Sequence, residues 1–407
     1  MGSASAASGR RTAGLLCTLL AAALAVAACG GSSQSSSSSN ANANKTPYQL
    51  AFIADLTGGN AGNSIGAQAG LTTALKEIND AGGADGHKLN VTSYDSQSVA
   101  TTHTAVLRQA LGTNPTVVTG AWVSGSTAAS ASIFASSSVP VVTSGYIISG
   151  VDSIPGFLAT SPLPDGVGAG VANGLKTIFG GSLSGKKVGF EGLVSPAVDA
   201  NLAGTKTAVE AAGGSMGMVV RDPLTFSSWS GQATNMVASR ADAMIVNNTD
   251  PNTSTVVKAL LVAGFKGPII STEGANSDEL LKGIDSSQFS VVRETIVPTP
   301  SDKLYKNAVA VGVSGQLTAQ SFFGKQYAAT YAIARALAKC GDNCTGTKFV
   351  SAIKGLGKFT VPNNALAGPL DFSKSHAGLT TAQVWVWDSS KNASVAKGAP
   401  FSIVTSH

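Results

Sequence analysis

Short runs rich in β-branched residues alternate with longer segments of helical periodicity from Gln49 onward, and this alternation constrains the fold more than any other feature. Gln49–Ala54 is expected to form a strand, and Ser64–Ala81 a helix that ends at Gly82 and Gly83. Strands that alternate with helices are typical of parallel sheets with helices on both faces. The sequence therefore predicts an α/β fold.

The same alternation continues through most of the chain, and it predicts a series of further elements. Ser126 is a plausible N-cap for one of the helices. Strands are expected at Lys88–Tyr94, Thr116–Thr119, Val139–Thr143, Lys187–Gly192, Met216–Val220, Ala243–Val246 and Pro268–Ser271. Helices are expected at Val99–Leu111, Ser126–Ser137, Gly166–Phe179, Val198–Ala212, Ser230–Ser239, Thr253–Ala263, Ser301–Val313 and Ser321–Lys339.

Two proline-marked breaks, Ser161–Asp165 and Val297–Pro300, divide this pattern into two lobes. The helices after the second break have no strand between them and could return to the first lobe. A third crossing between the lobes is expected near Gln383–Asp388, which would complete a hinge. The expected boundaries are 48–162 plus 299–382 for the first, N-terminal lobe and 163–298 plus 383–407 for the second, C-terminal lobe.

Residues 1–28 have the features of a signal peptide. Two arginines precede an apolar stretch, residues 13–26, that is short for a membrane span. Two alanines directly before Cys29 resemble the bacterial lipobox, so lipidation of Cys29 is expected to hold the protein at the outer face of the cell membrane. The alternative is an ordinary signal peptide whose cleavage site happens to precede a cysteine. Residues 29–47 would be a Ser/Asn-rich tether.

Charge and composition exclude several classes of partner. Removing the leader takes away two arginines and no acid, so the formal net charge falls from +5 to +3. The pair Lys186-Lys187 is the largest basic cluster, and nucleic-acid binding is therefore not expected. The four histidines are dispersed, so neither a metal site nor a cofactor is expected.

Cys340 and Cys344 remain once Cys17 leaves with the leader and Cys29 is acylated. They flank a Gly-Asp-Asn turn, and an oxidising exterior would keep them paired as a disulfide. A metal site at this place would need further ligands.

Eight short motifs follow one another along nearly the whole chain after the tether: Ala54–Gly58, Lys76–Gly83, Tyr94–Ser96, Gly120–Thr127, Val139–Thr143, Ala263–Phe265, Thr272–Ala275 and Gly368–Phe372. In this order they resemble the type I periplasmic binding proteins, and the subgroup they resemble most is the leucine/isoleucine/valine-binding proteins of ABC importers. The resemblance implies two Rossmann-like lobes that close over a small solute, and a loaded form that docks on membrane permease subunits.

The first-lobe site residues follow from this resemblance and from the fold. Ser124, Gly125 and Ser126 lie where a loop enters a helix, and similar family members use this loop to hold the ligand carboxylate. The alternative is an exposed turn that only caps the helix. Tyr146 belongs to a loop that faces the same cleft in relatives, or it covers the lobe edge. Trp122 is a candidate apolar wall, although aromatic residues more often pack in the core.

Glu273 resembles the family position whose carboxylate pairs with the ammonium of the ligand. Opposite an anion-binding loop it would select zwitterions, because an unpaired buried charge is costly. The alternative is a surface acid at a strand end. Thr57 and Asn63 complete the expected ligand-binding set, and Phe322 or Phe323 is a further candidate wall.

The chain also departs from the pattern of branched-chain amino acid receptors. Leu193–Asp199 stands where those relatives carry a tyrosine, and Asn247–Asp250 replaces another family aromatic. An arginine common in relatives is replaced within Phe157–Thr160. The second-lobe wall is therefore expected to be smaller and more polar than in those relatives.

The resemblance implies a monomeric solute-binding lipoprotein of an ABC importer that captures a branched-chain-like amino acid or a similar small zwitterion. Catalysis is not expected, because the sequence has no Gly-x-Ser-x-Gly elbow, no phosphate loop and no histidine in a candidate cleft loop. The alternative is a lipid-anchored sensor that signals to a membrane partner, and its sequence would look the same. A structural adhesin without a ligand is a third reading.

Overall fold

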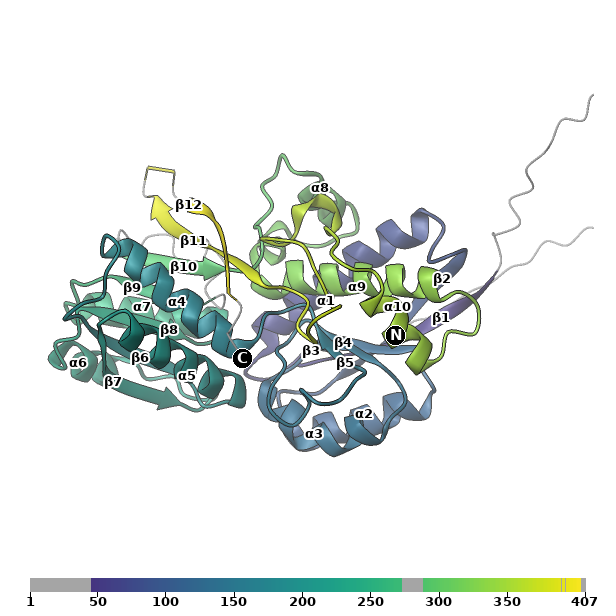
Figure 1. Ribbon diagram of the computed structural model, residues 1–407, viewed down its shortest axis with the longest axis horizontal. Coiled ribbons are helices and arrows are strands. Elements are labelled where there is room, and N and C mark those ends of the chain that lie inside the picture. Colours follow the sequence, from purple (N-terminus) through teal and green to yellow (C-terminus); the bar gives the residue numbers. More distant parts are fainter. Residues whose placement is uncertain (1–44, 273–287, 389, 392, 404–407) are drawn as a thin grey trace, which may run out of the picture. The chain divides into compact units, whose positions relative to one another are not determined.

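A computed structural model describes residues 45–272, 288–388, 390–391 and 393–403, which form two lobes, each built on one β-sheet (Figure 1). The predicted α/β fold with two helix-covered, mostly parallel sheets is confirmed. The predicted signal peptide, the lipidation site Cys29 and the candidate ligand residue Glu273 lie outside the described residues.

The first lobe contains a parallel sheet of five strands in the order β2-β1-β3-β4-β5. In strand β1, which lies between β2 and β3, the side chains alternate between two hydrophobic cores, because successive side chains of a strand point to opposite faces of the sheet. Leu50 packs with helices on one face, and Ala51 and Ile53 pack with helices on the other. The strands are β1 (Lys45–Ala54), β2 (His87–Asp95), β3 (Val117–Ala121), β4 (Val141–Thr143) and β5 (Phe157–Ala159).

Helices cover both faces of this sheet: α2 and α3 lie on one side, and α1 and α9 on the other (Figure 1). Gly70 allows α1 and α9 to approach closely, since a Cβ atom there would meet the carbonyl oxygen of Phe323 at 2.1 Å. The helices are α1 (Ala61–Asp80), α2 (Ala100–Gly112), α3 (Ser124–Ser136), α8 (Lys303–Ala310), α9 (Ser321–Cys340) and α10 (Gly346–Lys354), with short 3₁₀ helices η3 (Gly315–Ala319) and η4 (Pro362–Asn364).

The second lobe contains seven strands in the order β12-β11-β10-β9-β8-β6-β7, of which β10, β11 and β12 pair antiparallel. Alternate residues of β8 again face two cores: Ile245 packs with α4 and α5, and Met244 with α6 and α7. The strands are β6 (Lys187–Leu193), β7 (Ser215–Asp222), β8 (Ala243–Asn247), β9 (Ile269–Ser271), β10 (Phe289–Arg293), β11 (Thr381–Asp388) and β12 (Ala393–Ser402). The helices are α4 (Pro164–Ile178), α5 (Pro196–Ala211), α6 (Ser230–Ala238) and α7 (Asp250–Val262).

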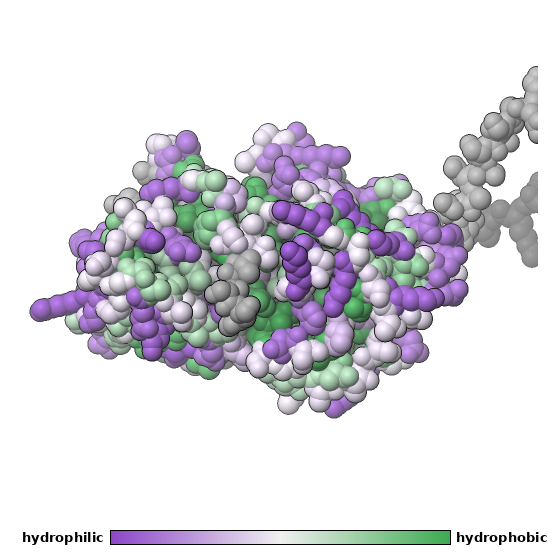
Figure 2. Space-filling view, in the orientation of Figure 1, coloured by the Kyte–Doolittle hydropathy of each residue, from purple (hydrophilic) through white to green (hydrophobic). Residues whose placement is uncertain are grey.

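The helices bury one side and leave polar residues outside, so the face seen in Figure 2 is mainly hydrophilic, with hydrophobic residues in smaller areas. Among the described residues, no helix combines the length and the apolar character needed to cross a membrane.

Three segments connect the lobes: the first links β5 to α4, the second links β10 to α8, and the third leads into β11. Adjacent hinge segments pair through isolated bridges, such as Thr295 with Leu366 and Ala159 with Ala377. The third crossing ends earlier than the predicted Gln383–Asp388, because those residues pair with β10 and β12 inside the second sheet.

Other differences from the sequence-based predictions are local. Residues 45–47 belong to β1 rather than to the tether, since Lys45 pairs with His87 of β2. The helix expected from Ser126 begins at Ser124 with Val123 at the N-cap, so the Ser126 N-cap was wrong. Strands β5, β10, β11 and β12 were not predicted.

Cys340 and Cys344 form a disulfide with a Cα–Cα distance of 5.5 Å. The loop between them brings Asp342 to the start of the first sheet. There its Oδ1 atom lies 3.2 Å from Lys45 Nζ and 2.7 Å from His87 Nε2. The disulfide loop therefore contacts the first described residue of the chain.

Candidate ligand-binding site

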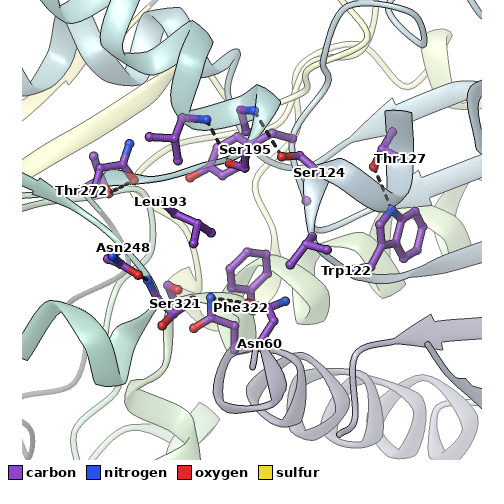
Figure 3. A pocket seen from close by; sticks show the side chains of 18 of the residues that line it. Asn60, Trp122, Ser124, Thr127, Leu193, Ser195, Asn248, Thr272, Ser321 and Phe322 are labelled. Carbon is purple, nitrogen blue, oxygen red and sulfur yellow. Dashed lines mark hydrogen bonds between the residues drawn. The ribbon is translucent and has the colours of Figure 1, made fainter. Parts of the chain in front are cut away.

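A cavity lies where the carboxyl ends of parallel strands from both sheets come together (Figure 3). The loops after β3, β4, β6, β8 and β9 all contribute to its lining. Ligands of open α/β sheets bind at such strand ends. Its volume is about 100 Å³. A single water needs roughly 10–15 Å³ by the same measure, so the cavity suits a small solute.

The buried carboxylate of Asp55 holds residues of the first-lobe wall in place. Its carboxylate accepts hydrogen bonds from Asn60 Nδ2 at 2.9 Å, from the backbone N–H of Val123 at 2.9 Å and from Ser96 Oγ at 2.6 Å. Asn60 and Val123 line the cavity. Burial raises the pKa of the Asp55 carboxyl, and these hydrogen bonds oppose the rise because they stabilise the charged form.

The predicted carboxylate loop is only partly in the cavity. Ser124 lines it, and its Oγ accepts a 3.2 Å hydrogen bond from the backbone N–H of Ala197 in the second lobe (Figure 3). Gly125 and Ser126 are not among the described lining residues, and the Ser126 hydroxyl is buried without a partner among the described residues. Thr127, one helical turn on, lines the cavity instead.

Trp122 lines the cavity, and its Nε1–H donates to Thr127 Oγ1 at 2.8 Å (Figure 3). This bond satisfies the only polar group of the indole and leaves its rings as an apolar wall. Phe322 also lines the cavity, whereas Phe323 is buried in the first-lobe core. Tyr146 is a lining residue as well.

Asn63 and Thr57 have different positions. Asn63 lines the cavity, and its Oδ1 accepts a 3.4 Å hydrogen bond from the backbone N–H of Asp250 in the second lobe. Thr57 lies on an exposed loop, where its hydroxyl donates to Asp95 at 2.7 Å. Thr57 is not among the described residues that line the cavity.

The described part of the second-lobe wall is rich in amides and hydroxyls. Thr272 Oγ1 donates to Asn247 Oδ1 at 3.0 Å, and Asn248 Nδ2 donates to Glu191 Oε1 at 2.8 Å. Leu193 and Val198 add apolar surface beside these groups. The position of Glu273, directly after Thr272, is outside the described residues.

Glu191 lies behind Asn248 at the end of β6 and is fully buried. Burial raises the pKa of its carboxyl to about 8, since desolvation disfavours the charged form and the hydrogen bond from Asn248 only partly offsets it. Near neutral pH this group is therefore mainly protonated. Sequence reasoning missed Glu191, because an acid within a predicted strand carries no sign of which face it occupies.

Lys325 was also missed. It lies in the second turn of α9, lines the cavity and is fully buried in an ion pair with Glu294, with Nζ 2.8 Å from Oε2. The available signal was an isolated lysine, since no other charged residue occurs between Ser321 and Ala334 in a helix rich in alanine and aromatic residues.

One group of described side chains has atoms of the kinds that ligate metals. Asp85, His87 and Asp342 place such atoms within 4.8 Å of one another. The Lys45 ammonium lies 3.0 Å from Asp85 and 3.2 Å from Asp342, so a positive charge from the chain itself already serves both carboxylates. This cluster is separate from the described cavity lining.

Two α/β lobes that meet around a cavity at their strand ends are the arrangement of type I periplasmic binding proteins. The family model described as periplasmic binding protein matches residues 47–393. The chain therefore belongs to the periplasmic binding protein family, as the sequence motifs predicted.

Solved structures share this fold at low sequence identity. A fatty acid ABC transporter substrate-binding protein from Thermomonospora curvata is 17% identical, with a TM-score of 0.76 over 89% of this chain and 94% of that one. A leucine-binding protein from Thermotoga maritima is 16% identical, with a TM-score of 0.72 over 86% and 98%. A branched-chain amino acid transporter substrate-binding protein from Streptococcus pneumoniae, in complex with isoleucine, is 17% identical, with a TM-score of 0.70 over 88% and 99%. No curated protein matches the chain.

Proposed function

We propose that this chain is the extracytoplasmic solute-binding lipoprotein of an ABC importer. It captures an amino acid or a similar small zwitterion between its lobes and delivers it, as a monomer, to membrane permease subunits. The observation that carries this proposal is the small cavity at the strand ends, which is lined by residues of both lobes. A ligand that contacts both walls favours the conformation in which they are close together.

The first lobe supplies groups suited to a carboxylate. Ser124 begins α3, and the first N–H groups of a helix have no partner within the helix. Such N–H groups, with the Ser124 hydroxyl nearby in the lining, bind an anion without a dedicated arginine.

The ammonium of the ligand is assigned to the second lobe. Glu273 follows Thr272, which lines the cavity, so its carboxylate is proposed to pair with the ammonium. The amide oxygen of Asn247, which accepts one hydrogen bond from Thr272, is a further acceptor in that wall.

The remaining lining suits an apolar side chain of modest size. Trp122, Phe322, Leu193 and Val198 supply the apolar surface. The isoleucine complex of the Streptococcus relative supports a branched aliphatic cargo, and the fatty acid protein from Thermomonospora makes short-chain carboxylic acids the natural comparison.

Binding rather than catalysis is proposed, because the family is one of solute-binding proteins. Lipidation of Cys29 and removal of residues 1–28 are part of the same proposal, and the intact mass of the mature protein tests them. Genes for a permease and an ATPase beside the gene of this chain would favour import, whereas a sensor kinase gene would favour the signalling alternative.

The experiment that tests the function is a thermal-shift screen of the lipid-free chain, Cys29→Ser, against amino acids, short-chain acids, polyamines and sugars. A ligand at a hundredfold its Kd adds about 2.7 kcal/mol, which raises Tm by a few degrees. A shift with one solute class supports the receptor function. A flat screen, repeated after unfolding and refolding to remove bound solute, contradicts it.

The role of Glu273 has its own test. Glu273→Ala is expected to weaken binding of an amino-bearing ligand about a hundredfold, since one partner of a charge pair is lost. Titration calorimetry measures the loss, and Glu210→Ala on the exposed side of α5 is the matched control. Unchanged affinity in Glu273→Ala would remove Glu273 from the site.

A further inference from the structure

Lys325 lies beneath the first-lobe wall of the cavity. Its side chain is fully buried, and two aromatic rings lie over the ammonium: Tyr146 with its centroid 4.5 Å from Nζ, and Phe322 at 4.9 Å. All three residues line the cavity. The positive charge is therefore next to the space where the solute is proposed to bind.

Glu294 balances this charge from the side away from the cavity. It follows β10 in the second crossing, its Oε2 lies 2.8 Å from Lys325 Nζ, and it is not among the described lining residues. The Tyr146 hydroxyl accepts a 3.2 Å hydrogen bond from Lys325 and lies 3.4 Å from Glu294. The ion pair thus has its positive end nearer to the cavity.

The Lys325–Glu294 pair has no net charge, but its two charges lie at different distances from the cavity. It therefore still exerts an electrostatic force on a nearby ligand. Coulomb energy falls with distance and is only weakly screened where water is excluded, so the nearer charge dominates. Lys325 therefore attracts an anionic group to the same wall that presents Ser124 and the start of α3. The second lobe holds the proposed ammonium partner, and the two walls favour one orientation of a zwitterion.

We propose that Lys325 is a specificity residue of this cavity, that it selects solutes carrying a carboxylate and draws this group to the first-lobe wall, and that Glu294 positions its ammonium. The inference rests on the proposed function and adds the charge of the ligand group that faces the first lobe.

If Lys325 and Glu294 had only a structural role, removing their charges would have a different effect. Thr160 in the first crossing donates a hydrogen bond to the carbonyl oxygen of Lys325 at 3.0 Å, so the start of α9 also holds the hinge together. Removing both charges would then change stability and leave the choice of ligand unaltered.

The test compares L-leucine, L-isoleucine and L-valine with their carboxamides, which keep the ammonium and lose the carboxylate charge. Titration calorimetry on the lipid-free chain is expected to show each bound acid preferred over its amide by about tenfold or more. In the Lys325→Met/Glu294→Gln double variant the preference is expected to fall to within about threefold. Lys76→Met, an exposed lysine on α1, is the control and keeps the preference.

Glu294→Gln alone gives the opposite change, which a structural role would not produce. It removes the offsetting charge, so the preference for the acid over the amide is expected to increase when the titration is made at a pH low enough for Lys325 to keep its proton. This variant also decides the question if the double variant does not fold, as judged by circular dichroism.

The outcomes separate the two proposals. Equal binding of acid and amide by the natural chain, or an unchanged preference in the variants, overturns the role of Lys325 and leaves the receptor function standing. If none of the three acids binds the natural chain at millimolar concentration, both the proposed amino acid cargo and this inference fail.

Discussion

Asp55 in the first lobe and Glu191 in the second are buried carboxyl groups that hold residues of the cavity lining, and the two lobes treat these groups differently. Asp55 in the first lobe accepts hydrogen bonds from two side chains and two backbone N–H groups. Glu191 in the second lobe accepts one, from Asn248, and its Oε2 has no partner among the described residues. Burial raises the pKa of both carboxyls. At Asp55 four hydrogen bonds oppose this rise, whereas at Glu191 only one hydrogen bond, from Asn248, opposes it.

The difference shows which wall is fixed before a ligand arrives. The donors to Asp55 come from the loop after β1, the loop after β2 and the loop after β3, so one carboxylate holds three loops in place. In the second lobe, Asn248 is held by the carboxyl group of Glu191, whose pKa of about 8 lies close to neutral pH. We therefore regard the first lobe as the preorganised half of the site and the second as the half that responds to conditions.

The largest expected effect is that of Asp55→Ala. The change leaves several buried donors without an acceptor, and each such group costs about 1–3 kcal/mol. We expect the free energy of unfolding to fall by about 3–5 kcal/mol, measured by urea denaturation. Asp80→Ala, on the exposed end of α1, is the control. A loss below about 1 kcal/mol, the scale of a single hydrogen bond, would show that Asp55 does not hold the loops.

Glu191→Gln tests the second lobe through pH. The folded pKa of Glu191, about 8, lies above its ordinary value of 4.5, so the folded state binds the proton more tightly than the unfolded state. The tighter proton binding contributes fully to the free energy of unfolding below pH 4.5. This contribution is lost as the pH rises through about 8. Urea denaturation at several pH values is expected to show a smaller loss of stability toward alkaline pH in Glu191→Gln than in the natural chain. Parallel curves for the two proteins would refute this.

The hydrogen bonds between the lobes are expected to have a moderate effect. Ser124→Ala and Asn63→Ala each remove one acceptor for a backbone N–H of the opposite lobe. One neutral hydrogen bond is worth about 1 kcal/mol, so we expect affinity to fall roughly fivefold in each variant. Ser126→Ala, two residues along α3, is the control, since the Ser126 hydroxyl has no partner among the described residues. An equal loss in all three variants would argue against a role for these bonds.

The smallest expected effect is that of Thr57→Ala. The resemblance to relatives placed Thr57 in the site, but its hydroxyl donates to Asp95 on an exposed loop. Surface substitutions usually change stability by less than about 0.5 kcal/mol, so affinity should stay within about threefold of the natural value. Titration calorimetry measures it, and a loss of tenfold or more would return Thr57 to the ligand-binding set.

Much of the fold was predictable because parallel strands are buried on both faces and read as short apolar runs. Ala243–Val246, which reads Ala-Met-Ile-Val, is such a run. The strands that escaped prediction lack this signature: β5 has only three residues, and β10 contains Ser290 and Arg293, whose guanidinium is buried over the ring of Trp385. Tertiary contacts, rather than local pattern, place these residues in a sheet.

The site was predictable where it follows strands in sequence. Trp122, Ser124 and Tyr146 come directly after β3 and β4, and all three line the cavity. Lys325 reaches the same wall from a helix far along the chain, and the topology rather than any motif brings it there. Buried charges such as Lys325 and Glu191 also contradict the usual exposure of these residue types, so sequence reasoning passes over them.

Helix α9 connects the cavity with the disulfide loop. Its first turns carry Phe322 and Lys325 at the cavity, and its last residue, Cys340, belongs to the disulfide loop that contacts Lys45. A helix of this length, 20 residues, is about 30 Å long. Strand β1 begins at the same Lys45 and ends beside Asp55 behind the cavity. The cavity and the point where the described chain enters the first lobe therefore lie at opposite ends of the same two elements, α9 and β1.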